Sequence, residues 1–246
     1  MSTPRIRIFA GPNGSGKSTF NRLVPAHLLG NYINPDDIER SIKDTGYFDF
    51  TSYRIEAHKE AIFDFLREHP LLQKFPHSLA KLDSLKIDGE RLSFSNTEID
   101  SYVASALSDF IRRSLIKERI SFTFETVMSS SDKVSLLAEA HQSGYRVYVY
   151  YVATADPQIN IARVAYRVSQ GGHSVPPDKI EARYWRSLEL LSEAILTSNR
   201  AYIFDNSDEG SEGLTQIAEI TDGELIEIKS DIQPPWFKEF VLDKLI

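Results

Sequence analysis

Hydrophobic positions along the chain fall into two patterns, short β-type runs and longer stretches with helical spacing. Runs rich in β-branched and aromatic residues predict strands at 5–10, 31–34, 121–125, 146–153 and 200–205. Helical spacing predicts helices at 17–28, 37–43, 52–68, 100–117, 132–142, 157–170 and 178–196. Because strands and helices alternate, the pattern indicates an α/β fold with a mostly parallel sheet and helices on both faces.

Residues 70–95 break this alternation. They contain Pro70, Pro76 and Gly89 and show no clean hydrophobic period. We therefore expect a single domain over 1–246 in which 70–95 is an insertion beside the main sheet. The regions 156–196 and 217–246 are expected to form a helical lid and a C-terminal hairpin with a helix.

The first predicted strand leads into a glycine-rich loop and then a helix. The loop, Gly11-Pro12-Asn13-Gly14-Ser15-Gly16-Lys17-Ser18, fits the phosphate-loop pattern G-x-x-x-x-G-K-[ST] at every fixed position. Its backbone N–H groups are expected to face phosphate oxygens, with Lys17 reaching the β- and γ-phosphates and Ser18 ligating Mg²⁺. With Thr19, these residues form the predicted ATP site. The loop alone leaves a motor ATPase, a GTPase switch and a kinase open.

Two acidic positions follow predicted strands, at the sheet edge where α/β proteins bind ligands. Asp36 follows the second strand, where it could take a proton from an acceptor hydroxyl or merely cap the next helix. Glu125 and Thr126 lie where the strand at 121–125 ends, and there the carboxylate either contacts substrate or magnesium-bound water or has a structural hydrogen-bonding role.

Paired arginines flank the turn at Gly171-Gly172. Arg163 and Arg167 are four residues apart and so share one helix face, and Arg183 and Arg186 begin a similar face on the next helix. A mobile helical lid of this kind could place positive charge over a transferring phosphate. The alternative without a catalytic role is a solvated basic face.

The composition argues against several other classes of protein. The chain has 246 residues, 41% hydrophobic and 26% charged, with a net charge of −7 that argues against nucleic-acid binding. It has no cysteine, which excludes thiolate ligands and a cysteine nucleophile. The longest apolar run, 147–153, is far too short for a membrane span, and we expect a cytoplasmic protein.

Four segments together resemble the zeta-toxin family of P-loop kinases, specifically its bacterial branch with a GGHxVP segment. They are GPNGSGKST at 11–19, NPD at 34–36, FET at 124–126, and R-x₃-R-x₃-GGH-x-VP-x₃-I-x₂-R at 163–183. The resemblance spans about residues 5–207.

The resemblance implies a three-layer P-loop kinase fold and ATP- and Mg²⁺-dependent phosphorylation of a hydroxyl of a small molecule, with UDP-N-acetylglucosamine as the candidate acceptor. It implies Asp36 as the base or substrate-hydroxyl ligand, Glu125 and Thr126 as sugar-nucleotide contacts, and Arg163 and Arg167 as phosphate-stabilising residues. It also implies an antitoxin protein as a partner.

A P-loop ATPase or a noncatalytic nucleotide-binding module stays an alternative. The strand at 200–205 is followed by Asn206-Ser207 rather than the acidic pair of a motor ATPase, and the chain has no N-K-x-D guanine-reading segment.

Overall fold

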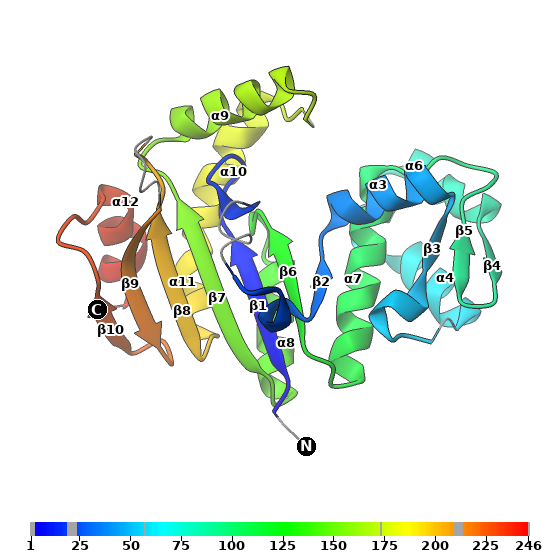
Figure 1. The fold of residues 1–246 in the computed structure, drawn as a ribbon, viewed down its shortest axis with the longest axis horizontal. Helices are drawn as coiled ribbons and strands as arrows, with labels where there is room; N and C mark the ends of the chain where they lie inside the picture. Colours follow the sequence, from blue (N-terminus) through cyan, green and yellow to red (C-terminus); the bar gives the residue numbers. More distant parts are fainter. Residues whose placement is uncertain (1–2, 19–23, 57, 173, 209–213, 246) are drawn as a thin grey trace. The chain divides into compact units, whose positions relative to one another are not determined.

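The computed structural model describes residues 3–18, 24–56, 58–172, 174–208 and 214–245 (Figure 1). Contacts between residues divide the chain into two compact units. The first unit comprises Met1–Gly30 and Thr123–Ile246, and the second comprises Asn31–Phe122. The predicted insertion at 70–95 therefore lies inside the second unit.

The first unit is built on a twisted sheet whose strands run in the order β10-β9-β8-β7-β1-β6. The strands are β1 (Arg5–Ala10), β6 (Phe122–Thr126), β7 (Arg146–Ala153), β8 (Arg200–Asp205), β9 (Thr215–Thr221) and β10 (Leu225–Ile228). β7 is parallel to both β1 and β8, whereas the β9–β10 hairpin joins β8 in the antiparallel direction. The predicted mostly parallel α/β sheet and the C-terminal hairpin are both confirmed.

Helices of the first unit pack against this sheet, and α10 and α11 lie behind β7 and β8 in the view of Figure 1. The helices are α2 (Ala26–Leu29), α8 (Asp132–Gln142), α9 (Pro157–Ser169), α10 (Pro177–Glu189), α11 (Leu191–Leu196), α12 (Pro235–Phe237), the π-helical turn η3 (Lys238–Leu242) and α13 (Asp243–Leu245). The helix predicted at 178–196 is two helices, because the helical structure is interrupted at Leu190.

Side chains of β7 alternate between the core and the opposite face of the sheet. Val147, Val149 and Tyr151 are fully buried on the core side. On the other face Tyr150 is half-buried and stacks on Tyr202 of β8, with ring centroids 4.8 Å apart. From Arg146 to Tyr151 the buried positions therefore alternate, as the two-residue period of a strand requires, whereas Val152 and Ala153 at the end of the strand are buried as well.

The second unit combines α-helices with a small antiparallel sheet of order β3-β5-β4. Its elements are β2 (Asn31–Ile33), α3 (Pro35–Thr45), β3 (Tyr47–Asp49), the 3₁₀ turn η1 (Phe50–Tyr53), α4 (Lys59–Glu68), α5 (Pro70–Gln73), α6 (Pro76–Ala80), the 3₁₀ turn η2 (Lys81–Ser84), β4 (Lys86–Asp88), β5 (Arg91–Ser93) and α7 (Ser101–Lys117). The helix predicted at 52–68 begins only at Lys59, and the three short strands were not predicted. Phe110 of α7 makes edge contacts with Phe50 and Phe65, which places an aromatic core between α7 and these elements.

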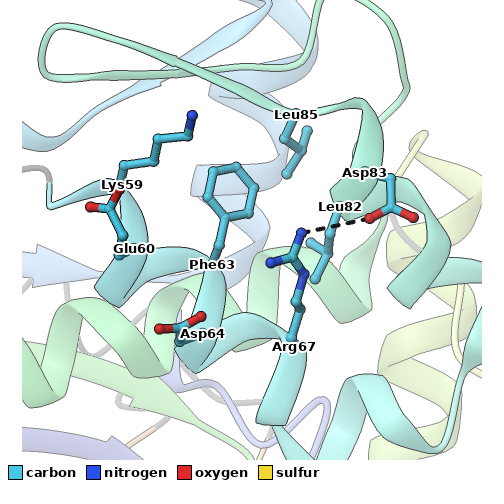
Figure 2. Close-up of a pocket in the computed structure, with 8 residues that line it drawn as sticks. All are labelled: Lys59, Glu60, Phe63, Asp64, Arg67, Leu82, Asp83 and Leu85. Atoms are coloured by element: carbon cyan, nitrogen blue, oxygen red, sulfur yellow. Dashed lines mark ion pairs between the residues drawn. The ribbon is translucent and has the colours of Figure 1, made fainter.

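A pocket of about 270 Å³ opens beside α4 in the second unit (Figure 2). Its apolar lining is Phe63, Leu82 and Leu85, and its charged lining includes Arg67 and Asp83. The Arg67 guanidinium is 3.7 Å from the Asp83 carboxylate and lies over the Phe63 ring. These charges are therefore already matched, and none of the predicted site residues lines the pocket.

The start of α7 depends on one carboxylate, that of Asp100. One of its oxygens accepts hydrogen bonds from the N–H groups of Tyr102 and Val103, both at 3.0 Å. The other oxygen accepts from the Ser78 hydroxyl and lies 2.9 Å from the Lys81 ammonium. Burial opposes ionisation of Asp100, but the hydrogen bonds from Lys81, the Val103 amide and Ser78 outweigh it and hold its pKa below the ordinary value.

We expect Asp100→Ala to lower the free energy of unfolding by about 2 kcal/mol, since it removes a helix cap and a partly buried ion pair together. Because the folded pKa is depressed, this contribution is complete above the unfolded pKa of about 4 and is lost as the pH falls through the folded pKa. Urea unfolding followed by circular dichroism at several pH values measures both effects. Asp100→Asn keeps one acceptor for the cap, so a loss equal to that of Asp100→Ala would contradict the role of the cap.

Candidate nucleotide-binding site

The glycine-rich loop connects the end of β1 to a helical turn that begins at Lys17. Gly11, Gly14 and Gly16 have φ angles of 138°, 78° and 101°, a region that side-chain-bearing residues rarely adopt. A Cβ atom on Gly11 would lie 2.0 Å from the carbonyl oxygen of Val152 near the end of β7. The loop therefore needs glycine both for its backbone angles and for its close packing on the sheet.

The ammonium group of Lys17 lies within the loop. The residue is only 7% exposed, and its Nζ donates to the carbonyl oxygens of Gly11 and Pro12, each at 2.8 Å. A buried cation among backbone carbonyls remains strongly attractive to an anion, since little water screens it.

The hydroxyl of Ser15 gives an independent sign of a ligand in this loop. Ser15 is fully buried, and its Oγ has no hydrogen-bond partner within the part of the chain that the structure describes. A buried hydroxyl without a partner costs free energy unless a ligand or water satisfies it. Together with the glycine backbone and Lys17, this donor fits a phosphate group.

Ser18 and Glu125 lie next to each other, although they are 107 positions apart. The Ser18 Oγ is 3.4 Å from Oε1 of Glu125, which stands at the carboxyl end of β6. Mg²⁺ prefers oxygen ligands and is usually held by one or two side chains plus substrate phosphates. Within the described ranges no cluster of three or more His, Asp or Glu residues could hold a metal by itself. This oxygen pair beside the loop fits Mg²⁺ bound together with phosphate.

Thr126 has a local role in the described structure. Its hydroxyl accepts a hydrogen bond from the N–H of Met128 at 3.0 Å. Met128 is fully buried and has a φ of 52°, a strained value for a residue with a side chain. The Thr126 hydroxyl therefore stabilises the tight turn after β6, while its predicted contact with substrate stays a prediction.

Arg163 and Arg167 both lie on α9, which begins at Pro157. The guanidinium of Arg163 is half-buried, and its Nη1 donates to the carbonyl oxygen of Asn206 at 2.6 Å. Arg167 is exposed, and Gly172 packs against it so closely that a Cβ there would be 2.7 Å from Cγ of Arg167. The structure thus connects Arg163 of α9 to the segment that follows β8.

Asp36 belongs to the second unit, in the first turn of α3. The helix begins at Pro35, and its cap is Asn34, whose Oδ1 accepts from the N–H of Asp36 at 3.0 Å. The interpretation of Asp36 as the helix cap is therefore wrong. The Asp36 side chain is exposed, and its role as base stays a prediction. Thr19, predicted to bind nucleotide, lies outside the described residues.

Three residues around the loop were not predicted from the sequence. The Nδ2 of Asn160 donates to the carbonyl of Asn13 at 2.6 Å, and the Nδ2 of Asn206 donates to the carbonyl of Ser15 at 2.7 Å. The Thr154 hydroxyl donates in turn to Oδ1 of Asn160. The sequence offers only a faint signal, an asparagine in the first turns of a helix and another just after a strand.

The sheet topology and the glycine-rich loop together correspond to a P-loop kinase-like fold. In structural comparison, the AvrRxo1-ORF1:AvrRxo1-ORF2 complex with sulphate ions matches with a TM-score of 0.54 at 12% identity, covering 97% of this chain and 64% of that chain. The PezAT toxin–antitoxin system of Streptococcus pneumoniae matches with a TM-score of 0.50 at 12% identity, covering 99% of this chain and 85% of that chain. At this identity the matches establish the fold alone.

Sequence comparison points in the same direction. A profile of the zeta toxin family matches residues 93–211, and this match agrees with the resemblance that the motifs indicate. A Haemophilus influenzae protein described only as uncharacterized is 32% identical over 69 residues, which are 28% of this chain. The matched stretch spans about half of that relative's length, 49%.

One further finding concerns membranes. None of the helices in the described part of the chain is both long and apolar enough to cross a bilayer.

Proposed function

We propose that this chain is an ATP- and Mg²⁺-dependent phosphotransferase that moves the γ-phosphate to a hydroxyl group of a small molecule. The observation that carries the proposal is the contact of Ser18 with Glu125 at 3.4 Å, directly beside the glycine loop and Lys17. It supplies oxygen ligands for magnesium where the loop would hold the phosphates. The zeta toxin match and a structural neighbour crystallised with ATP, the AvrRxo1-ORF1:-ORF2 complex, agree with it.

In the proposed reaction, the acceptor hydroxyl oxygen forms a new bond to the γ-phosphorus while the bond to the β-phosphate bridging oxygen breaks. The hydroxyl proton passes to the Asp36 carboxylate, and ADP leaves. The loop N–H groups and Lys17 stabilise charge that develops on the phosphate oxygens, and Arg163 or Arg167 adds positive charge from α9. Bound Mg²⁺ would neutralise part of the phosphate charge, held by Ser18 with Glu125 nearby.

For the acceptor we propose a UDP-N-acetylamino sugar, with Glu125 and Thr126 among its contacts. The resemblance to zeta toxins supports this choice of substrate. It also supports an antitoxin protein as partner, since the PezAT neighbour is described as a toxin–antitoxin system.

The test is to incubate the protein with ATP, Mg²⁺ and a panel of UDP-sugars and to follow ADP release and acceptor mass. We expect ADP release only with a UDP-N-acetylamino sugar, together with a gain of one phosphate on that acceptor. Turnover without any acceptor would favour an ATPase instead. Nucleotide binding without turnover across the panel would favour a noncatalytic nucleotide-binding module.

A further inference from the structure

Two asparagine side chains hold the glycine loop through its backbone. The carbonyl oxygens of Asn13 and Ser15 accept hydrogen bonds from Nδ2 of Asn160 at 2.6 Å and of Asn206 at 2.7 Å. Each carbonyl is thereby paired with a side-chain donor from a different part of the first unit, one on α9 and one after β8.

Because the peptide bond is planar, holding a carbonyl group also sets the direction of the N–H group that follows it. In a trans peptide the C=O and the following N–H point to opposite sides. Fixing the carbonyls of Asn13 and Ser15 on the asparagines therefore directs the N–H groups of Gly14 and Gly16 away from the asparagines, to the side from which a phosphate could accept from them. The asparagines can thus shape a phosphate site without contacting the phosphate.

The glycines next to these carbonyls are fitted to the asparagines. A Cβ on Gly14 would lie 2.6 Å from the backbone oxygen of Asn160, and a Cβ on Gly16 would lie 2.2 Å from Nδ2 of Asn206. Gly14 occupies a variable position of the phosphate-loop pattern, so the pattern itself does not require glycine there. Its close approach to α9 does.

The orientation of the Asn160 carboxamide is set by its other partner. Thr154, directly after β7, donates its hydroxyl proton to Oδ1 of Asn160, and both residues are fully buried. Because a backbone carbonyl can only accept, Nδ2 must face Asn13 and Oδ1 must face Thr154. Asn206 is connected to α9 as well, since its carbonyl accepts from Arg163 at 2.6 Å.

We propose that Asn160 and Asn206 are positioning residues of the nucleotide site, and that Thr154 orients Asn160 for this role. They hold the loop in the conformation that directs the Gly14 and Gly16 N–H groups at phosphate. Asn206 also connects the loop to Arg163. The inference rests on the proposed function, because it assumes that the loop binds a nucleoside triphosphate.

The test measures binding by the full chain without any acceptor, so it does not depend on catalysis. The probes are Mg²⁺–ATP and inorganic tripolyphosphate, which retains the phosphates but lacks the base, and calorimetry gives both affinities. We expect Asn160→Ala and Asn206→Ala each to lower the affinity for both ligands roughly tenfold, because each variant removes one hydrogen bond that holds the loop in its binding conformation. Thr154→Val should weaken them in the same direction, while Thr154→Ser should restore binding.

Asn199→Ala is the matched control for a purely structural effect. Asn199 also uses its side chain to pair a backbone group, since its Oδ1 accepts from the N–H of Val147 at 2.9 Å. It precedes β8, at the end of the strand opposite Asn206. We expect Asn199→Ala to lower the unfolding temperature as much as the other two variants and to leave both affinities unchanged.

Three outcomes would overturn the inference. Unchanged affinities in Asn160→Ala and Asn206→Ala would remove the positioning role, and so would an equal loss in Asn199→Ala, which would mark a general stability effect. A wild-type chain that binds neither ligand would overturn the proposed function and the positioning role with it. Wild-type binding with unaltered variants would overturn the positioning role alone.

Discussion

Lys17→Ala is expected to reduce phosphate transfer by a factor on the order of 10² to 10³, the usual effect of removing one donor to developing charge in a closed site. Lys17 is the cation that the structure buries inside the glycine loop, 2.8 Å from two of its carbonyl oxygens. A bound triphosphate would compete with these carbonyls for the ammonium. Its loss therefore removes positive charge where phosphate charge is largest.

The same substitution should change stability little. It removes two hydrogen bonds from Lys17, but it also removes the cost of burying an ammonium group. We expect the free energy of unfolding to stay within about 1 kcal/mol of the wild-type value. Urea unfolding and a coupled assay of ADP release measure the two effects separately.

Lys229→Ala is the control for Lys17, because Lys229 is paired with Glu227 on the β10 side of the sheet and should not affect transfer. Transfer at the wild-type rate by Lys17→Ala would contradict the interpretation of 11–18 as a working phosphate loop. A large loss of stability would instead show that Lys17 is mainly a structural residue.

The elements best predicted from the sequence are those that neighbouring residues determine. The strands at 5–10, 146–153 and 200–205 have the predicted bounds, since each is a run of β-branched and aromatic residues next to turn residues. The hairpin was predicted for a similar reason, because Asp222-Gly223 is a typical turn sequence, and both residues adopt positive φ in the turn. The glycine-rich loop at 11–18 was recognised from its local sequence pattern, and Gly11, Gly14 and Gly16 have the positive φ angles that such a loop needs, while phosphate binding stays a prediction.

What the sequence did not reveal depends on contacts between distant segments. The strands β3, β4 and β5 have three residues each, too few to show a hydrophobic period, and they form by pairing with one another. The break at Leu190 carries neither glycine nor proline, so no local signal marks it. Nothing near Asn206 in the sequence points to Ser15, 191 positions away. The asparagines around the loop became visible only once the fold had brought them to it.

Asp36→Asn is expected to reduce transfer by about 10² to 10⁴, the range for loss of a general base, while nucleotide binding is retained. The side chain of Asp36 is exposed in the first turn of α3, and the cap of that helix is Asn34. Because the cap uses the backbone N–H of Asp36 and leaves its carboxylate out, the asparagine variant should fold normally. A loss of transfer could then be assigned to the proton acceptor.

The neighbouring Asp37 provides a close control. It is also exposed in the first turn of α3, but its carboxylate pairs with Arg40. Asp37→Asn changes the charge near the helix start by the same amount and should leave transfer unchanged. The measurement is the rate of acceptor phosphorylation at saturating ATP, with the ATP affinity of each variant determined by calorimetry. Equal losses of transfer in both variants would show that Asp36 acts only through its negative charge near the helix N-terminus. Transfer at the wild-type rate by Asp36→Asn would show that another group is the base.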